Sequence, residues 1–212
     1  MLDKNTEFAQ SELKRLNISF TESSFLTYLD HSDTTIVPLF ISAGMNPNAK
    51  TPEGTPGLLI AVQNRTLDIV RLLLESGAAF NATDKRGWTA LMFAAKKGDE
   101  DITTLLIKHK ANLNLTTIAF NWTALIFAVN SGHITIAEML LNNGAELNAT
   151  TIFNETPLMF AARNGFIDII KLLIDKGAEV SRQDRYGWTA FRFAQEHHYP
   201  ECAELLKNSP KS

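Results

Sequence analysis

The sequence predicts an elongated all-α protein, built from six stacked copies of one helix–turn–helix unit. A short phrase recurs as GWTALMFAA at residues 87–95, NWTALIFAV at 121–129, NETPLMFAA at 154–162 and GWTAFRFAQ at 187–195. The threonines of these phrases are 34, 33 and 33 residues apart, and glycines and apolar residues recur in the same register. A fixed period in this range is typical of solenoids, in which each unit buries its apolar face against its neighbours.

The first helix of each copy is expected to begin at the recurring threonine (Thr89, Thr123, Thr156, Thr189) or at the equivalent Pro56 and Ser23. A threonine hydroxyl can accept hydrogen bonds from the N–H groups of the opening turn. The helix is expected to end at a glycine such as Gly98, Gly132 or Gly165, because glycine readily adopts the left-handed conformation that closes a helix.

The second helix carries apolar residues at helical spacing, with an isoleucine followed by a leucine pair. We align Leu140–Leu141 with Leu105–Leu106, and we expect Leu106 and Leu141 to be buried between repeats. A second glycine (Gly77, Gly144 or Gly177) ends this helix, and an Asn-rich turn leads into the next copy.

The two ends of the chain are expected to cap the stack. Residues 1–20 form an N-terminal capping region, with a helix at 3–17 whose Phe8, Leu13 and Leu16 cover the first repeat. The predicted repeats span about 21–50, 51–83, 84–117, 118–150, 151–183 and 184–207. The first and last copies are degenerate, as capping repeats are in solenoids. Residues 208–212 are expected to be a disordered tail.

The repeating unit resembles the ankyrin repeat. The segment ETPLMFAARNGFIDIIKLLIDKGAEV, residues 155–180, matches that family's pattern of Thr-Pro-Leu, paired alanines, Gly, Ile, Leu-Leu and Gly-Ala. The usual histidine after Thr-Pro-Leu is replaced by Met92, Ile126, Met159 and Arg192. The segment LFISAGMNPNAK, residues 39–50, is similar to bacterial members of the family. The resemblance implies a non-enzymatic module that binds a partner protein.

Composition limits the classes of partner. The chain has 20 Lys and Arg against 23 Asp and Glu, which is not the basic excess typical of nucleic-acid-binding domains. No apolar run reaches membrane-spanning length, and the first residues contain no apolar signal-peptide segment. A single cysteine excludes an internal disulfide. We therefore expect a cytoplasmic monomer that binds neither nucleic acid nor membrane, unless a leaderless route exports it.

No catalytic, cofactor-binding or metal-binding residues are expected. Cys202 follows Thr189 by 13 residues, the offset of Ile102 from Thr89, so it replaces a core isoleucine. The adjacent His197 and His198 would point about 100° apart on a helix and could not chelate one ion together. Phosphate loops, cysteine clusters and acidic calcium loops are all missing from the sequence.

Aromatic residues mark a candidate binding face. Trp88, Trp122 and Trp188 directly precede the recurring threonine, in the turn that ankyrin repeats project from their concave side. Three residues before the threonine are Phe120, Phe153 and Tyr186. Aromatic residues at such positions are frequent anchors of interfaces. The alternative, that each tryptophan lies flat on its own repeat and shields the turn, stays open. Phe93, Phe127, Phe160 and Phe193 are instead expected in the core.

Charge is unevenly divided between the two faces. The positions that the family places on its concave side hold Lys85, Arg86, Lys96, Lys97, Arg163 and Arg185 against Glu53, Glu155 and Glu196. The exposed positions of the second helices hold three basic and eight acidic residues. A basic, aromatic face favours a partner protein with acidic and apolar groups together.

Three hypotheses about function follow. The first is a protein-binding module that acts as a scaffold, or as an inhibitor or antidote of an enzyme or toxin. The second is a secreted bacterial effector that acts on host proteins. The third is an enzyme, and no constellation of residues in the sequence supports it.

Overall fold

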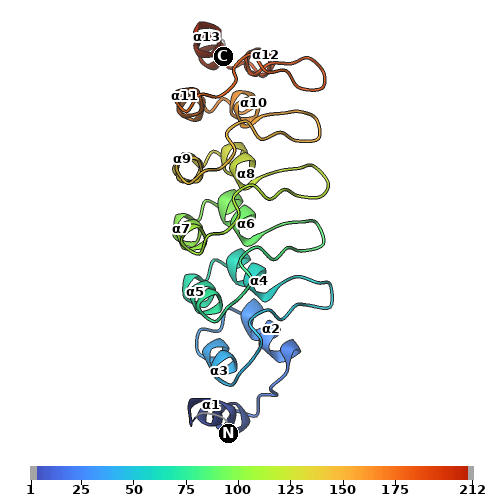
Figure 1. Ribbon diagram of the computed structural model, residues 1–212, viewed down its shortest axis with the longest axis vertical. Helices are drawn as coiled ribbons and strands as arrows, with labels where there is room; N and C mark the ends of the chain where they lie inside the picture. The colour runs from blue at the N-terminus through green and yellow to red at the C-terminus, as the bar shows by residue number, and fades with distance from the viewer. Residues whose placement is uncertain (1–3, 210–212) are drawn as a thin grey trace.

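The computed structural model describes residues 4–209, which fold into one elongated stack of helices (Figure 1). α1 (Lys4–Arg15) precedes six helix pairs. These are α2 (Glu22–Asp30) and α3 (Ile36–Ser42); α4 (Gly57–Gln63) and α5 (Leu67–Glu75); α6 (Ala90–Lys97) and α7 (Glu100–Lys108); α8 (Ala124–Asn130) and α9 (Ile134–Asn142); α10 (Pro157–Arg163) and α11 (Ile167–Asp175); α12 (Ala190–Glu196) and α13 (Pro200–Asn208). The predicted all-α solenoid of six repeats is confirmed, and extended pairing within residues 4–209 is limited to isolated bridges.

The helix pairs form two parallel rows, and long loops project from one side of the stack (Figure 1). Each first helix packs against the first helix of the next repeat, and the second helices do the same. A first helix is therefore enclosed by both neighbours and by its own second helix, so all six residues of ALMFAA at 90–95 are buried. This packing explains the recurring phrase, because alanines allow the helices to approach while Leu, Met and Phe fill the space between them.

Threonine caps begin the first helices as expected. The hydroxyl of Thr89 accepts a hydrogen bond from the Met92 N–H at 3.2 Å, and the Thr89 N–H donates to the Met92 Sδ at 3.5 Å. Thr156 and Met159 make the same two contacts, so methionine closes the turn where the ankyrin pattern usually has histidine. In the first repeat the cap is Thr21 and not Ser23, so α2 begins two residues earlier than expected. The expected register holds at its other end, where the C-cap His31 follows Ser23 by eight residues as Asn64 follows Pro56.

Turn asparagines connect each repeat to the next. The side-chain oxygen of Asn114 accepts a hydrogen bond from the Glu146 N–H at 2.9 Å, and its amide donates to the Gly144 carbonyl at 3.4 Å. Asn48, Asn81 and Asn148 accept equivalent bonds from the following repeat. These bonds satisfy turn N–H groups and hold successive turns in register.

Glycine is required at residue 165, where the next repeat approaches closely. Gly165 has φ +70°, and a Cβ atom there would lie 2.4 Å from the ring of Tyr199. Any side chain at this position would displace the ring and strain the backbone. In the last repeat, where no further unit follows among the described residues, His198 takes the equivalent position with φ +61°.

The core differs from expectation at one leucine. Leu106 is fully buried, but Leu141 is only half-buried, and the buried residue of α9 is Leu140. The reason is the extra residue between Asn114 and Thr123, which moves the position equivalent to Leu106 to Leu140, 34 residues later. Our alignment of the pair Leu140–Leu141 is therefore wrong by one residue.

The N-terminal helix covers the first repeat with a narrower surface than expected. α1 packs on α3 through Ala9 and Leu13, whereas Phe8 is 63% and Leu16 42% exposed, so the expectation for these two residues is wrong. Phe8 lies next to Ala9 on the helix, about 100° around its axis, and Leu16 follows the last helical residue. At the other end α13 continues to Asn208. Residues 1–3 of the capping region and 210–212 of the predicted tail lie outside the described residues.

Candidate partner-binding face

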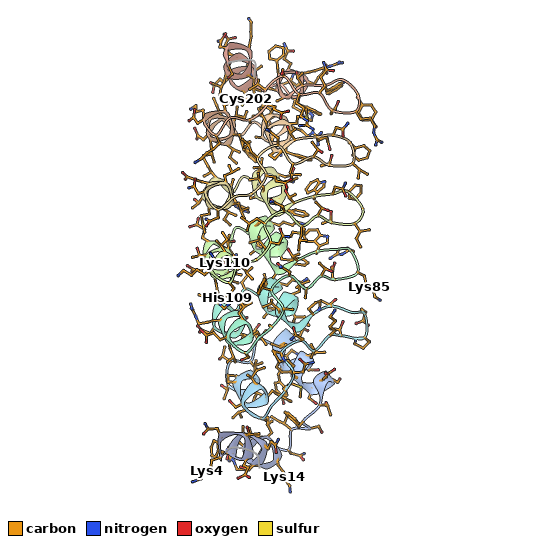
Figure 2. All side chains as sticks on the ribbon, viewed as in Figure 1. Lys4, Lys14, Lys85, His109, Lys110 and Cys202 are labelled. Carbon is orange, nitrogen blue, oxygen red and sulfur yellow. The ribbon has the colours of Figure 1, made fainter. Side chains whose placement is uncertain are left out.

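The twelve candidate residues lie on the loops before α6, α8, α10 and α12 and at the C-terminal ends of α6 and α10. We call this surface the loop face. Figure 2 shows Lys85 at the loop side of the stack, opposite His109 and Lys110 on the row of second helices. The side chain of Lys96 reaches Trp88, and that of Arg163 reaches Glu155, so the helix ends and loops form one continuous surface.

The phenylalanine series lies in the core. Phe93, Phe127, Phe160 and Phe193 are between 2% and 8% exposed, so the expectation that they are core residues is confirmed. Their rings form the inner wall of the loop face, because the tryptophans pack directly on them.

The tryptophans are half-buried and connect adjacent repeats. The ring of Trp88 lies 4.7 Å from that of Phe93 in its own repeat and 4.3 Å from that of Phe127 in the next. Trp122 packs in the same way on Phe127 and Phe160, at 4.9 and 5.0 Å. Trp88 and Trp122 therefore contribute to packing between repeats and still present part of their surface to solvent. Trp188 contacts Phe193 of its own repeat, at 5.2 Å.

Two of the expected basic residues are internally paired. Arg163 forms an ion pair with Glu155 and lies 4.5 Å from the ring of Phe193. Arg86 pairs with Asp84 at 3.1 Å, a residue that our division of charge between the two faces left out. A charge that is already compensated contributes little to the attraction of a partner, so the net positive charge of the loop face is smaller than the sequence suggests.

Other basic side chains of the loop face remain exposed. Lys96 lies over the ring of Trp88, with Nζ 5.1 Å from its centroid. The guanidinium of Arg185 lies 5.2 Å from the ring of Phe153 and donates to the Ile152 carbonyl at 2.7 Å. Lys85 and Lys97 are exposed at the loop before α6 and at the end of α6. Cations held over aromatic rings in this way can bind a carboxylate without first losing much side-chain entropy.

The tips of two loops expose large apolar side chains. Tyr186 is 70% and Phe120 52% exposed, whereas Phe153 is half-buried. Ile118 is 73% exposed, and sequence reasoning missed it. The signal was present in the sequence, because TTI recurs at residues 116–118 and 150–152 and places Ile118 on the same loop as Phe120. The N–H groups of Ile118 and Ile152 donate equivalently to the Arg86 and Phe120 carbonyls of the preceding loop.

Two pockets open between neighbouring loops. The first, which we call the Trp88 pocket, has a volume of about 360 Å³ and is lined by Arg86, Trp88, Thr117, Ala119, Phe120, Trp122 and Phe127. The second, the Trp188 pocket, has a volume of about 480 Å³ and is lined by Phe153, Glu155, Arg163, Asp184, Tyr186, Trp188 and Phe193. Eight of the twelve candidate residues line one or other of these pockets. The pockets combine aromatic walls with a few polar groups, as binding sites commonly do.

The character of this side of the stack changes along its length. A groove of about 730 Å³ lies between α2 and the loop before α4, and its charged residues are Glu22, Asp30, Lys50 and Glu53. Hydrogen bonds from its own backbone N–H and from the Thr51 hydroxyl lower the pKa of Glu53. The N-terminal end is therefore acidic, and the aromatic and basic character begins at α6.

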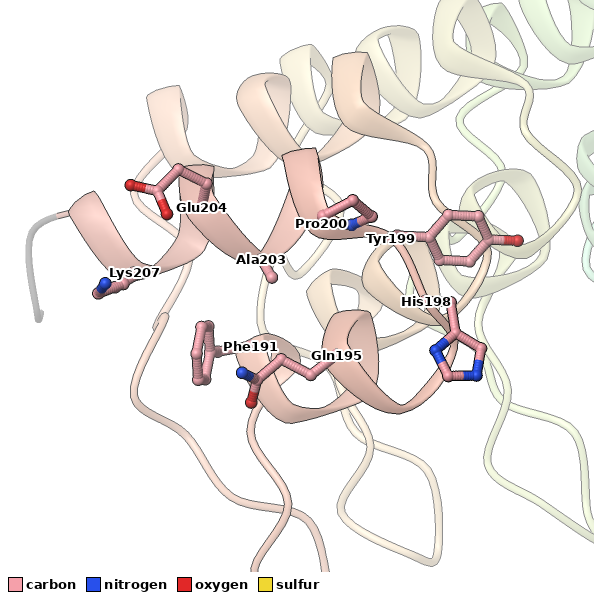
Figure 3. A pocket seen from close by; sticks show the side chains of 8 residues that line it. All are labelled: Phe191, Gln195, His198, Tyr199, Pro200, Ala203, Glu204 and Lys207. Atoms are coloured by element: carbon pink, nitrogen blue, oxygen red, sulfur yellow. The ribbon is translucent and has the colours of Figure 1, made fainter.

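A further hollow lies at the C-terminal end of the stack (Figure 3), with a volume of about 620 Å³. Phe191, Tyr199 and Ala203 line it together with polar residues such as Glu204 and Lys207. Phe191 occupies the position of Leu91, Leu125 and Leu158, which the following repeat buries. This hollow is thus the uncovered side of the last repeat, and none of the candidate residues lies in it.

Cys202 is buried at 3% exposure, so its expected place in the core is confirmed. Burial raises the pKa of the Cys202 thiol, and the nearby Glu201 carboxylate adds to the effect, so less of the reactive thiolate forms at neutral pH. We expect a thiol reagent to label the folded protein slowly and the urea-denatured protein quickly. Equal labelling rates in the two states would contradict a structural role for this thiol.

Between residues 4 and 209, no group of three His, Cys, Asp or Glu side chains could hold a metal ion. In the same part of the chain, no helix combines the length and apolar character that crossing a membrane requires.

A family model described as ankyrin repeats (3 copies) matches the chain three times, over residues 26–117, 58–151 and 150–211. A comparison with curated proteins gave no match. The three segments together run from residue 26 to residue 211, and they include five of the six helix pairs in full and most of the first. The chain therefore belongs to the ankyrin repeat family.

Proposed function

We propose that this protein is a non-enzymatic binding module that holds a partner protein on its loop face. Ankyrin repeats are generally protein–protein interaction modules, and the family is typically non-enzymatic. The observation that carries the proposal is the exposure of large apolar side chains on one face, with Ile118 and Phe120 beside one aromatic pocket and Tyr186 beside another two repeats away. Large apolar side chains that are gathered at one surface are typical of interaction sites.

The chemistry of the loop face indicates the chemistry of the partner. Lys85, Lys96, Lys97 and Arg185 are exposed on the same face as the apolar tips, so a complementary surface carries carboxylates as well as apolar groups. We propose that the protein acts as a monomer in the cytoplasm, since its one cysteine is buried and unpaired, which fits a reducing compartment. A module without catalytic groups acts by occupying a partner's surface, as a scaffold, an inhibitor or an antidote does.

Affinity capture from the native organism tests this proposal. The tagged protein should retain a partner that mass spectrometry identifies, and the double variant Lys96→Glu, Lys97→Glu should retain much less of it. With the purified partner, this variant should slow association most at low ionic strength, because charges at an interface act mainly on the rate of encounter.

The matched control reverses two charges on the second helices. Asp101 and Asp168 are exposed there, and Asp101→Lys with Asp168→Lys should leave capture almost unchanged. If the control variant loses the partner and the Lys96, Lys97 variant keeps it, the proposed binding face is wrong.

A further inference from the structure

The Trp88 and Trp188 pockets are separated by two repeats. The first lies between the loops before α6 and α8, and the second between the loops before α10 and α12. Neighbouring packed helices are about 8–10 Å apart, so two repeats place the pockets about 16–20 Å from each other. With volumes of about 360 and 480 Å³, they lie at the small end of the range for ligand pockets, which suits one bulky side chain each.

Contacts between the intervening loops fill part of the surface between the two pockets. The Ile152 N–H donates to the Phe120 carbonyl at 3.2 Å, which joins the two intervening loops, and Trp122 packs on Phe160 beneath them. Ile118 and Phe120 project at the edge of the Trp88 pocket. A rigid helix with a diameter of about 10 Å would meet these loop tips before its side chains filled both pockets. An extended chain is narrower and can reach both.

The spacing then defines the sequence of such a chain. An extended segment rises about 3.3 Å per residue and turns alternate side chains to opposite sides. Residues i and i+6 are therefore about 20 Å apart and point the same way. Lys96 flanks the first pocket, with Nζ 5.1 Å from the ring of Trp88, and Arg185 flanks the second through its contact with Phe153. The Arg192 guanidinium lies 4.3 Å from the ring of Trp188 and is paired with Glu196 at 3.9 Å. These cations favour carboxylates beside the apolar residues.

We propose that the loop face holds its partner through an extended segment with two large apolar side chains six residues apart, flanked by acidic residues. This inference rests on the proposed function, that the loop face binds a protein. It adds the conformation and sequence pattern of the bound segment.

Selection from a phage library of random 16-residue peptides, with the whole protein as target, tests the pattern. Enriched peptides should carry Trp, Phe, Leu or Ile at i and i+6 and a net negative charge. A synthetic copy of an enriched peptide should lose affinity by about tenfold or more when one residue is inserted between the two apolar positions, because the second then points away from its pocket. Fluorescence anisotropy measures this change.

Variants of exposed residues locate the peptide without disturbing the core. Phe120→Ser and Tyr186→Ser should each weaken the synthetic peptide by about tenfold, as the loss of an interface anchor does. Phe8→Ser removes an equally exposed aromatic ring from α1 and should have no effect.

The outcomes separate the two proposals. Enriched peptides with one apolar residue or with helical spacings of three, four or seven, or no enrichment at all, would overturn the extended-segment inference. The capture experiment decides the proposed function independently, since it depends on Lys96 and Lys97 and on a native partner of any conformation.

Discussion

Replacing Leu140 with alanine should lower the free energy of unfolding by about 2–5 kcal/mol, whereas the same change at the adjacent Leu141 should have a much smaller effect. Leu140 is fully buried on α9, where the second-helix row packs α7 and α11 on either side of it. Its removal leaves a cavity that the surrounding helices cannot fill, and a cavity adds to the loss of apolar transfer free energy. Leu141 is half-buried and faces partly toward solvent.

Urea denaturation followed by far-ultraviolet circular dichroism measures both variants. Leu106→Ala, the equivalent substitution one repeat earlier, should match Leu140→Ala because Leu106 is equally buried. Each repeat is stabilised mainly by its nearest neighbours, so a defect in the middle of the stack should weaken both halves of the array. Equal losses at Leu140 and Leu141, or a loss within about 0.5 kcal/mol at Leu140, would show that the register of α9 is not the one described.

The fold was predictable because the repeat makes each structural requirement visible several times. A threonine cap, a glycine terminator and a buried leucine that recur every 33 or 34 residues identify a helix pair more reliably than any single window does. The prediction was wrong where the repetition is interrupted. The inserted residue before Thr123 shifted the pair at Leu140, and α2 is capped by Thr21, two residues before the position that the period predicts.

The candidate site was predictable in part. Sequence position alone indicated which residues lie on the loops, since the loops are fixed relative to the recurring threonine. Position could not reveal that Glu155 pairs with Arg163 or that Asp84 pairs with Arg86, because these contacts depend on where side chains of different helices and loops meet. The exposure of Ile118 depends likewise on how the longer loop lies over Gly87, where a Cβ atom would be only 3.0 Å from Ile118.

The tryptophans pack on phenylalanines of the core, and we propose that they also contact the partner, so a mutation must separate the two effects. The position before the recurring threonine is Thr55 and Glu155 in other repeats, so the repeat forms without an aromatic residue there. In the loop face, however, Trp88 packs between Phe93 and Phe127, and part of any effect of its removal will be on stability. Only a loss of binding at a temperature where the variant is fully folded reports on the interface.

Under that condition, Trp88→Ala or Trp122→Ala should weaken binding of the captured partner by about 2 kcal/mol or more, close to thirtyfold in Kd, as aromatic interface anchors do. Both rings line the Trp88 pocket, so the two losses should not add in the double variant. Trp122→Phe keeps an aromatic ring on Phe127 and should preserve stability better than affinity. Isothermal titration gives the affinities and thermal unfolding the stabilities. If Trp88→Ala and Trp122→Ala lower the melting temperature but leave Kd unchanged, the tryptophans serve packing alone and the partner contacts another part of the loop face.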